Sequence, residues 1–314
     1  MRVLVARRVD PAAVALLRRS ADVEYHDENQ PLPRAYLLEH VHAFDAVLST
    51  VTERFDAEVL RRGTPRLRAV SNMAAGLDNV DVACAAELGI RVFNAPESTV
   101  EATADHTLAV ALALIRQVVP AGRFVRDGGW KGWDPYLFLG RTISGLTWGL
   151  YGFGRIGQAV ARRAAAFGAS ISYYDRSVSI TSLDGGVAVR RVGRDELLAG
   201  SDVLSVHVPL TAETTGCIGG AELRSMKPGA FLVNMARGKV VDSAALAEVL
   251  RQRRIAGAAL DVFDPEPLGP PHEILEIDNV LLTPHIGTGT VECRREMAVQ
   301  AARNLIDFFA ESRG

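Results

Sequence analysis

The sequence contains little cysteine, and its cysteines form no pattern. Cys84, Cys217 and Cys293 are an odd, scattered set without a C-x-x-C pair, which argues against a disulfide framework. No apolar stretch is long enough to cross a bilayer, and the longest covers residues 108–115. The formal net charge is -2 and no run of lysine or arginine stands out, so nothing indicates a nucleic-acid or membrane partner. We expect a cytoplasmic, soluble protein that binds neither and holds no metal.

The order of the apolar runs indicates the fold class. A chain of 314 residues, 48% of them apolar, is long enough for two domains with separate cores. Asp10 and Pro11 are expected to start the first helix, as N-cap and first-turn proline. Strands alternating with helices predict an α/β fold with two doubly wound parallel-sheet domains. In the first half, the expected strands are residues 2–6, 46–49, 67–72 and 90–93.

The segment 100–119 differs from the other helical segments because apolar residues cover almost its whole circumference. Such a helix is buried on more than one side. It packs either against another subunit or between the two domains, and both arrangements can hold together. The Gly- and Trp-rich stretch 127–140 that follows is long for a simple connection, as is typical of functional or interface-forming loops.

A glycine-rich turn lies between an expected strand at 146–151 and an expected helix at 156–167. Its first glycine permits a tight turn, its second the approach of a pyrophosphate, and its third close helix–strand packing. The helix N-terminus adds N–H donors. A further strand ends in an aspartate at about the 20-residue distance expected of a ribose-binding acid. The motif therefore predicts dinucleotide contacts at Gly152, Gly154, Arg155, Ile156, Gly157 and Asp175.

Asp175 and Arg176 indicate different dinucleotides. A carboxylate repels a ribose 2′-phosphate, which favours NAD(H), whereas an adjacent arginine can accommodate that phosphate. We therefore expect NAD(H), with NADP(H) left open. A complete α/β unit precedes the glycine turn, so the nucleotide-binding domain, residues 98–288, is expected to be inserted into a substrate domain. That domain would comprise residues 1–97 and 289–314, with the ligand cleft between the two domains.

Three polar side chains downstream of the turn suggest the chemistry. Arg237 follows the apolar run 231–233, which places it at the carboxyl end of a strand, where doubly wound folds bind ligands. A guanidinium holds a carboxylate by two parallel hydrogen bonds. His285 can transfer a proton near neutral pH, and a carboxylate such as Glu266 can orient it. Beside a dinucleotide-binding turn, this trio predicts hydride transfer between a nicotinamide and a small 2-oxo or 2-hydroxy acid.

Five stretches together resemble the D-isomer-specific 2-hydroxyacid dehydrogenase family. They are residues 72–81, 152–157, 207–211 and 234–238, and the pair Glu266 and His285. The resemblance covers essentially the whole chain. Within the family, residues 71–76, 130–135 and 283–287 are most similar to the glyoxylate/hydroxypyruvate reductase branch. The family implies a flavodoxin-like substrate domain, a Rossmann nucleotide-binding domain, and a homodimer formed through residues 100–140.

The resemblance also assigns roles to single residues. His285 is implied as the acid/base, Glu266 as its partner, and Arg237 as the clamp on the substrate carboxylate. Backbone N–H groups of Ala75 and Gly76 would bind the same carboxylate. Leu48 either lines the pocket or packs in the core, and His106 is expected to be structural. The remaining implied cofactor contacts are Thr103, His207, Pro209, Ala236 and Asp261, the last of them on the nicotinamide carboxamide.

Other functions remain open at this point. Phosphite and formate dehydrogenases use a similar constellation on the same fold, and residues 132–135 do not exclude the phosphite type. A protein that senses NAD(H) without catalysis, like the family's transcriptional corepressors, belongs to a different class. The intact trio of Arg237, Glu266 and His285 favours catalysis over sensing.

Overall fold

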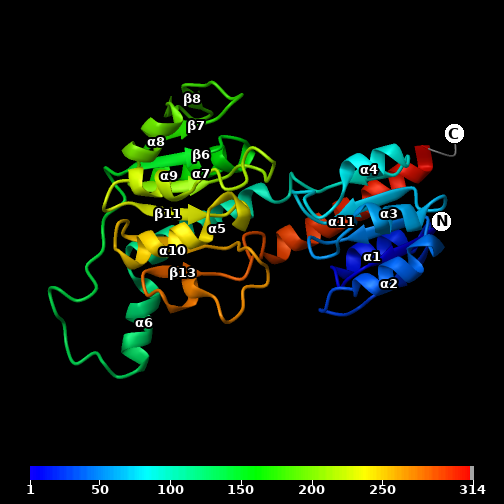
Figure 1. Cartoon of the computed structure of the whole chain (residues 1–314), viewed down its shortest axis with the longest axis horizontal. Helices are drawn as coiled ribbons and strands as arrows, with labels where there is room; N and C mark the ends of the chain where they lie inside the picture. The colour runs from blue at the N-terminus through cyan, green and yellow to red at the C-terminus, as the bar shows by residue number, and fades with distance from the viewer. Residues whose placement is uncertain (312–314) are drawn as a thin grey trace. The chain divides into compact units, whose positions relative to one another are not determined.

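The computed structural model describes residues 1–311, and its contacts divide the chain into two compact units (Figure 1). The first unit comprises Met1–Ala102 and the chain from Thr288 onward, and the second comprises Thr103–Gly287. These divisions fall within a few residues of the boundaries expected at 97/98 and 288/289.

The first unit is a parallel five-stranded sheet in the order β2-β1-β3-β4-β5, which is the flavodoxin-like order. The strands are β1 (Arg2–Val5), β2 (Asp22–Tyr25), β3 (Ala46–Ser49), β4 (Ala69–Asn72) and β5 (Arg91–Phe93). The helices are α1 (Pro11–Leu17), α2 (Arg34–His40), α3 (Ala57–Gly63), α4 (Val82–Glu87) and α11 (Val291–Glu311), with a 3-10 turn η1 (Val41–Ala43). Asp10 caps α1 as expected, because its carboxylate accepts the Ala12 N–H at 2.9 Å.

Both faces of this sheet are buried. Along β1, Val3 and Val5 belong to one core cluster, and Leu4 belongs to another on the opposite face. Neighbouring side chains of a strand point to opposite faces, so a strand covered on both sides is apolar throughout. Helices α1 and α11 cover the first face, and α2, α3 and α4 cover the second. Helix α11, far from the other helices of this unit in sequence, therefore completes the core of the first unit.

The second unit contains an eight-stranded sheet in the order β13-β12-β11-β10-β6-β7-β9-β8. The strands are β6 (Thr147–Tyr151), β7 (Ser170–Tyr174), β8 (Ser182–Leu183), β9 (Val187–Arg191), β10 (Val203–Val206), β11 (Phe231–Asn234), β12 (Gly257–Leu260) and β13 (Val280–Leu282). All pairs are parallel except β8 with β9 at the edge. The carboxyl ends of the parallel strands therefore share one edge, where ligands of doubly wound folds bind.

Helices α5 (Val100–Ile115) and α7 (Arg155–Ala166), together with α8 (Arg194–Gly200), α9 (Gly220–Ser225) and α10 (Ser243–Arg251), accompany this sheet. The 3-10 turns are η2 (Gly238–Val240) and η3 (Glu273–Glu276). Leu197, Leu223 and Leu246 from α8, α9 and α10 form one core with the sheet side chains that face them, such as Leu232.

The prediction of a single helix over residues 100–119 is wrong, because the structure has two helices there. Gln117 adopts the left-handed conformation, with φ of 51°, so the chain turns there and a separate helix α6 (Val118–Arg126) begins. Pro120 lies in the first turn of α6, where a missing N–H is tolerated. In one continuous helix it could not bond to the Arg116 carbonyl and its ring would clash with that group, so the proline accounts for the break. Figure 1 shows α6 and the segment that follows it projecting from the second unit.

Within residues 1–311, no single helix is long and apolar enough to span a membrane. Helices α5 and α6, bent by 61° at the break between them, pass such a test only as a pair, on length and composition.

Candidate active site

The glycine turn joins β6 to α7, and each of its glycines meets different surroundings. Gly152 has φ of 98°, and a Cβ there would lie 2.9 Å from the His207 carbonyl carbon. A Cβ on Gly157 would lie 2.5 Å from the Gly152 oxygen, so the third glycine permits the helix to pack on the turn. Over Gly154, the N-cap of α7, a Cβ would meet no atom within 4 Å. The turn therefore has the shape of a pyrophosphate cradle, open at the second glycine.

Asp175 follows β7 and is tied to this turn. Its Oδ2 accepts the Phe153 N–H at 2.8 Å, and its Oδ1 accepts the amides of Ser177 and Val178, each at 2.9 Å. Burial alone would raise the pKa of this carboxyl, but these backbone hydrogen bonds lower it below its usual range. A charged carboxylate is thereby fixed beside the glycine turn, as ribose recognition requires. Arg176 is exposed next to it.

His207 lies just beyond β10, where its N–H donates to the Tyr151 carbonyl at 2.8 Å. Trp148 Nε1 donates to Ser205 Oγ at 2.9 Å, and that hydroxyl lies 3.0 Å from His207 Nε2. The tryptophan can only donate, so the serine oxygen accepts from it and keeps one further lone pair and its own proton for the contact with the histidine ring. Burial lowers the pKa of His207 to about 3, which keeps the ring neutral. Pro209 is exposed two residues further on.

Arg237 stands on a tight turn after β11. The buried Asn234 side chain forms this turn, because it accepts the Ala236 N–H at 3.1 Å and donates to the Arg237 carbonyl at 3.0 Å. The guanidinium donates to the Ala236 carbonyl at 2.8 Å through Nη1. Arg237 is half-buried at the carboxyl edge of the sheet, the position expected for it.

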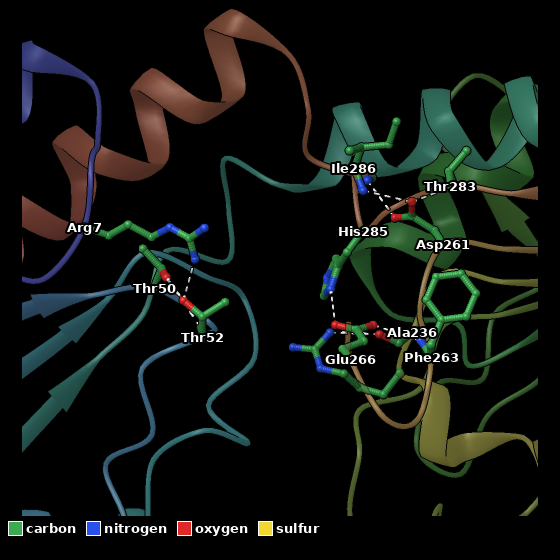
Figure 2. Close-up of polar contacts among 12 residues, drawn as sticks. Arg7, Thr50, Thr52, Ala236, Asp261, Phe263, Glu266, Thr283, His285 and Ile286 are labelled. Carbon is green, nitrogen blue, oxygen red and sulfur yellow. Dashed lines mark hydrogen bonds and ion pairs between the residues drawn. The ribbon is translucent and has the colours of Figure 1, made fainter. Parts of the chain in front are cut away.

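Glu266 and His285 form a close pair. His285 Nδ1 lies 2.9 Å from Glu266 Oε2, while Oε1 accepts the Phe263 N–H at 2.8 Å (Figure 2). With Nδ1 directed at the carboxylate, Nε2 is the nitrogen that remains to meet a substrate. Burial of the Glu266 carboxyl works to raise its pKa, but the hydrogen bond and charge of His285, with smaller help from Phe263 and Arg237, lower it.

The turns that carry Arg237 and Glu266 touch through a glycine. A Cβ on Gly238 would lie 2.0 Å from the Phe263 carbonyl carbon and 2.5 Å from the Asp264 nitrogen. Only glycine permits this approach. The structure thus brings together the three residues of the expected trio, within the second unit.

The backbone of His285 is held in an uncommon conformation. Its φ is 54°, in the left-handed region, which for a residue with a Cβ costs about 1–3 kcal/mol and persists only where the surroundings enforce it. Asp261 lies beneath this loop, 2% exposed, and accepts hydrogen bonds from Thr283 Oγ1, Ile286 N and Gly287 N. Burial would raise the pKa of Asp261, but hydrogen bonds from His106, Thr283 and the two amides lower it.

Thr103 lies beside the same loop. It is buried near the start of α5, and its Cγ2 would be 3.7 Å from a Cβ on Gly287. Its carbonyl accepts the hydroxyl of Thr107 at 2.7 Å.

The expected substrate contacts of the first unit lie at the carboxyl ends of its strands. Asn94 donates to the Ala75 carbonyl at 2.7 Å, and Asn72 donates to the Gly76 carbonyl at 3.0 Å. The Ala75 carbonyl shares a planar peptide group with the Gly76 N–H, so the bond from Asn94 also fixes the direction of that amide. Leu48 is fully buried in β3 among core side chains, the second of the two roles left open for it.

A polar network braces the neighbouring loop of the first unit. The carboxylate of Glu53, 1% exposed, accepts the Thr50 N–H at 2.7 Å and the Thr52 hydroxyl at 2.8 Å. Arg7 donates to the same Thr52 hydroxyl at 2.8 Å, as Figure 2 shows. No pattern in the sequence connects these residues.

The sequence alone did not identify several residues that the structure places at the site. Thr283 and Asn234 stand inside motifs that were recognised, but no role was assigned to their side chains. Arg191 Nη2 donates to the Asp175 carbonyl at 2.8 Å, and the only signal for it is an arginine pair on β9. His106 was taken as structural, yet its Nε2 lies 3.2 Å from Thr283 Oγ1. Within residues 1–311, no group of three or more His, Cys, Asp or Glu side chains is placed to hold a metal.

Comparison with known proteins agrees with this geometry. Residues 108–287 match the family described as "D-isomer specific 2-hydroxyacid dehydrogenase, NAD binding domain". A glyoxylate reductase of Aeropyrum pernix is 45% identical over 311 residues, which cover 98% of this chain and 92% of that protein. The chain therefore belongs to the D-isomer-specific 2-hydroxyacid dehydrogenase family, and it is an oxidoreductase that uses a nicotinamide cofactor.

Two solved structures show how far the likeness extends. The TT0316 protein of Thermus thermophilus is 45% identical, with a TM-score of 0.91 and coverage of 98% of this chain and 96% of that one. An NADPH-dependent glyoxylate/hydroxypyruvate reductase of Sinorhizobium meliloti, solved with NADP and malonate, is 31% identical. Its TM-score is 0.84, with coverage of 98% of this chain and 93% of that one. The expected family and its two-domain α/β fold are confirmed.

Proposed function

We propose that this enzyme reduces a short 2-oxo acid, such as glyoxylate or hydroxypyruvate, to the corresponding 2-hydroxy acid, in the D configuration where the product is chiral. The observation that carries the proposal is the pairing of His285 Nδ1 with Glu266 at 2.9 Å, on a turn in backbone contact with the Arg237 turn. The glyoxylate reductases among its relatives support the choice of acid.

The chemistry follows from the three side chains. Arg237 binds the substrate carboxylate with its guanidinium and draws electron density from the adjoining carbonyl. Protonated His285 donates from Nε2 to the carbonyl oxygen, while Glu266 stabilises the imidazolium and fixes its orientation. The bound nicotinamide supplies the hydride. In the reverse direction, neutral His285 accepts the hydroxyl proton.

The second unit is proposed to bind the dinucleotide, and the first unit to contribute the Ala75 and Gly76 amides to the substrate carboxylate. NAD(H) is favoured because the charged Asp175 carboxylate is fixed beside the glycine turn and would repel a 2′-phosphate. Arg176 and Arg191 are the groups through which NADP(H) would be accommodated. The proposed remaining contacts are Thr103, His207, Pro209, Ala236 and Asp261.

A homodimer through α5, α6 and the segment 127–140 is also proposed. Trp133 is 85% exposed and Tyr136 80% exposed, and valines on the preceding helix α6 are exposed as well. Exposed aromatic patches of this kind mark interfaces between proteins. Trp133→Glu should convert a dimer to a monomer in sedimentation analysis. A glutamate introduced in place of an exposed polar residue outside this region should leave the dimer intact.

The deciding experiment follows the absorbance of reduced nicotinamide. Glyoxylate, hydroxypyruvate, pyruvate and bulkier 2-oxo acids are each tested with NADH and NADPH, with His285→Ala as the control enzyme. We expect fast oxidation of NADH by a short 2-oxo acid, and a loss of at least about 10²-fold in kcat for the control, the scale of a lost general acid.

Three results would contradict the proposal. Turnover of phosphite or formate with NAD, and none of the 2-oxo acids, would reassign the substrate. Tight dinucleotide binding without turnover of any acid would support a sensor. Loss of NADH binding in His285→Ala would remove that residue from the acid/base role.

A further inference from the structure

The loop that carries His285 is fixed from below. Asp261 follows β12, and its two carboxylate oxygens accept three hydrogen bonds from the segment 283–287 (Figure 2). Thr283 Oγ1 donates to Oδ1 at 2.7 Å and Ile286 N to Oδ1 at 2.8 Å, while Gly287 N donates to Oδ2 at 2.7 Å. The donors lie on both sides of His285, so one carboxylate spans the residue whose φ is positive.

This arrangement stabilises an ionised carboxylate. The amides of Ile286 and Gly287 can only donate, and the Thr283 hydroxyl donates to Oδ1 as well, so all three hydrogen bonds favour the charged form. A buried acid stays charged where hydrogen bonds to its charged form outweigh the cost of burial. Oδ1 has both acceptor positions filled, by Thr283 and Ile286, while Oδ2 has one filled by Gly287. One acceptor position therefore remains for another donor.

His106 on α5 closes the arrangement from the other side. Its Nε2 lies 3.2 Å from Thr283 Oγ1 and 3.5 Å from Asp261 Oδ1. Because the Thr283 proton is given to Asp261, the hydroxyl accepts from His106, whose Nε2 then carries a proton. His106, 177 positions from Thr283 in the sequence, thus orients the Thr283 hydroxyl, which in turn donates to the Asp261 carboxylate.

We propose that Asp261, acting through Thr283 and the amides of Ile286 and Gly287, is a positioning residue that sets the backbone of His285 so that Nδ1 reaches Glu266. His106 supports Asp261 in this role. The inference rests on the proposed acid/base role of His285. It gives Asp261 a function that does not depend on contact with the nicotinamide.

The test removes one hydroxyl. Thr283→Val keeps the shape of the side chain and loses its hydrogen bonds, while Thr283→Ser keeps the hydroxyl. We expect Thr283→Val to lower kcat about 10- to 100-fold, the scale for a catalytic group displaced by a fraction of an ångström to one ångström. KM for the 2-oxo acid and Kd for the dinucleotide should stay within about threefold. Thr283→Ser should restore turnover.

A second readout needs no substrate. Hydrogen exchange at the Ile286 and Gly287 amides should be slow in the wild-type protein and at least about tenfold faster in Thr283→Val and Asp261→Asn. The thermal midpoint of each variant shows whether the fold is intact. If Thr283→Val does not fold, Gly287→Ala replaces it, because its Cβ would press on Asp261 Oδ2 at 3.1 Å and Met235 Cε at 3.3 Å.

The outcomes separate this inference from the proposed function. Full activity in His285→Ala would overturn the acid/base role and the inference that rests on it. An inactive His285→Ala, beside a Thr283→Val with wild-type kcat and slow exchange, would overturn the positioning role alone. So would a Thr283→Val that weakens dinucleotide binding and leaves kcat unchanged, because Asp261 would then act on the cofactor.

Discussion

The backbone of Gly238 lies against the carbonyl of Phe263 so closely that a Cβ on the glycine would be 2.1 Å from the oxygen. Arg237 precedes this glycine, and Glu266 follows Phe263 by three residues. The contact therefore sets the distance between the group proposed to bind the substrate carboxylate and the group that orients the proton donor.

Gly238→Ala should push these two turns apart. The atoms in its way are backbone, which cannot rotate aside, so we expect a loss of about 1–3 kcal/mol in the free energy of unfolding. Turnover should fall by at least about tenfold, since misplacing a catalytic group is costly. Gly200→Ala is the matched control, because a Cβ there meets nothing within 4 Å. Denaturant titration and steady-state kinetics measure both effects, and equal behaviour of the two variants would contradict the argument.

Arg237→Lys tests the two-pronged grip on the substrate. An ammonium is a point charge and cannot form two parallel hydrogen bonds with a carboxylate. Losing one charge-assisted hydrogen bond of about 1.5–3 kcal/mol should lower kcat/KM about 10- to 100-fold. Dinucleotide affinity should not change. Arg251→Lys, at an exposed ion pair with Glu273, is the control. Unchanged kinetics in Arg237→Lys would remove this residue from the site.

His207 should make stability depend on pH. Burial lowers its pKa in the folded protein from 6.5 to about 3, so between these values the unfolded chain binds one more proton than the folded one. The stability contributed by the neutral His207 ring is fully present above 6.5, the pKa of the ring in the unfolded chain. It is lost as the pH falls toward about 3, the pKa of the ring in the folded protein. The slope from this group is at most about 1.4 kcal/mol per pH unit.

The measurement is a set of urea titrations between about pH 4 and pH 7. His207→Gln should flatten the dependence over this range, whereas His42→Gln, at an exposed histidine, should leave it as in the wild type. Parallel pH profiles for wild type and His207→Gln would show that the buried ring does not carry the effect.

Asp175→Asn tests the choice of dinucleotide. Asparagine keeps an oxygen that can accept the Phe153 N–H, but it removes the charge that repels a 2′-phosphate. We expect the ratio of kcat/KM for NADPH over NADH to rise at least about tenfold, which corresponds to about 1.4 kcal/mol. Adding Arg191→Ala should reverse part of the gain. A ratio that stays constant in both variants would assign discrimination to other residues.

Much of the fold could be predicted because local signals agreed with one another. The apolar runs, the cap at Asp10 and the glycine turn each depend on residues close in sequence, and the structure confirms the elements that they mark. The break near Gln117 could have been foreseen from Pro120, because a proline cannot stand in the interior of a continuous helix without breaking or kinking it. The left-handed backbone of Gln117 itself has no such signal, because no glycine or asparagine stands there.

The site divides in the same way. Arg237, Glu266 and His285 stand in motifs with chemical meaning, so the sequence identified them. The carboxylate of Asp261 was assigned to the cofactor because nothing local shows that it spans the His285 loop. His106 and Thr283 meet across 177 residues, and only the folded chain brings them together.

The packing of α11 against α1 affects how the protein is made. Buried residues of α11, among them Met297, Ala301 and Leu305, fill the core into which Val14 and Leu17 of α1 also point. When residues 1–102 have been synthesised, this helix has not, and all of the second unit is made before α11 follows. The core of the first unit can therefore close only after the whole of the second unit has been synthesised, because α11 supplies part of that core.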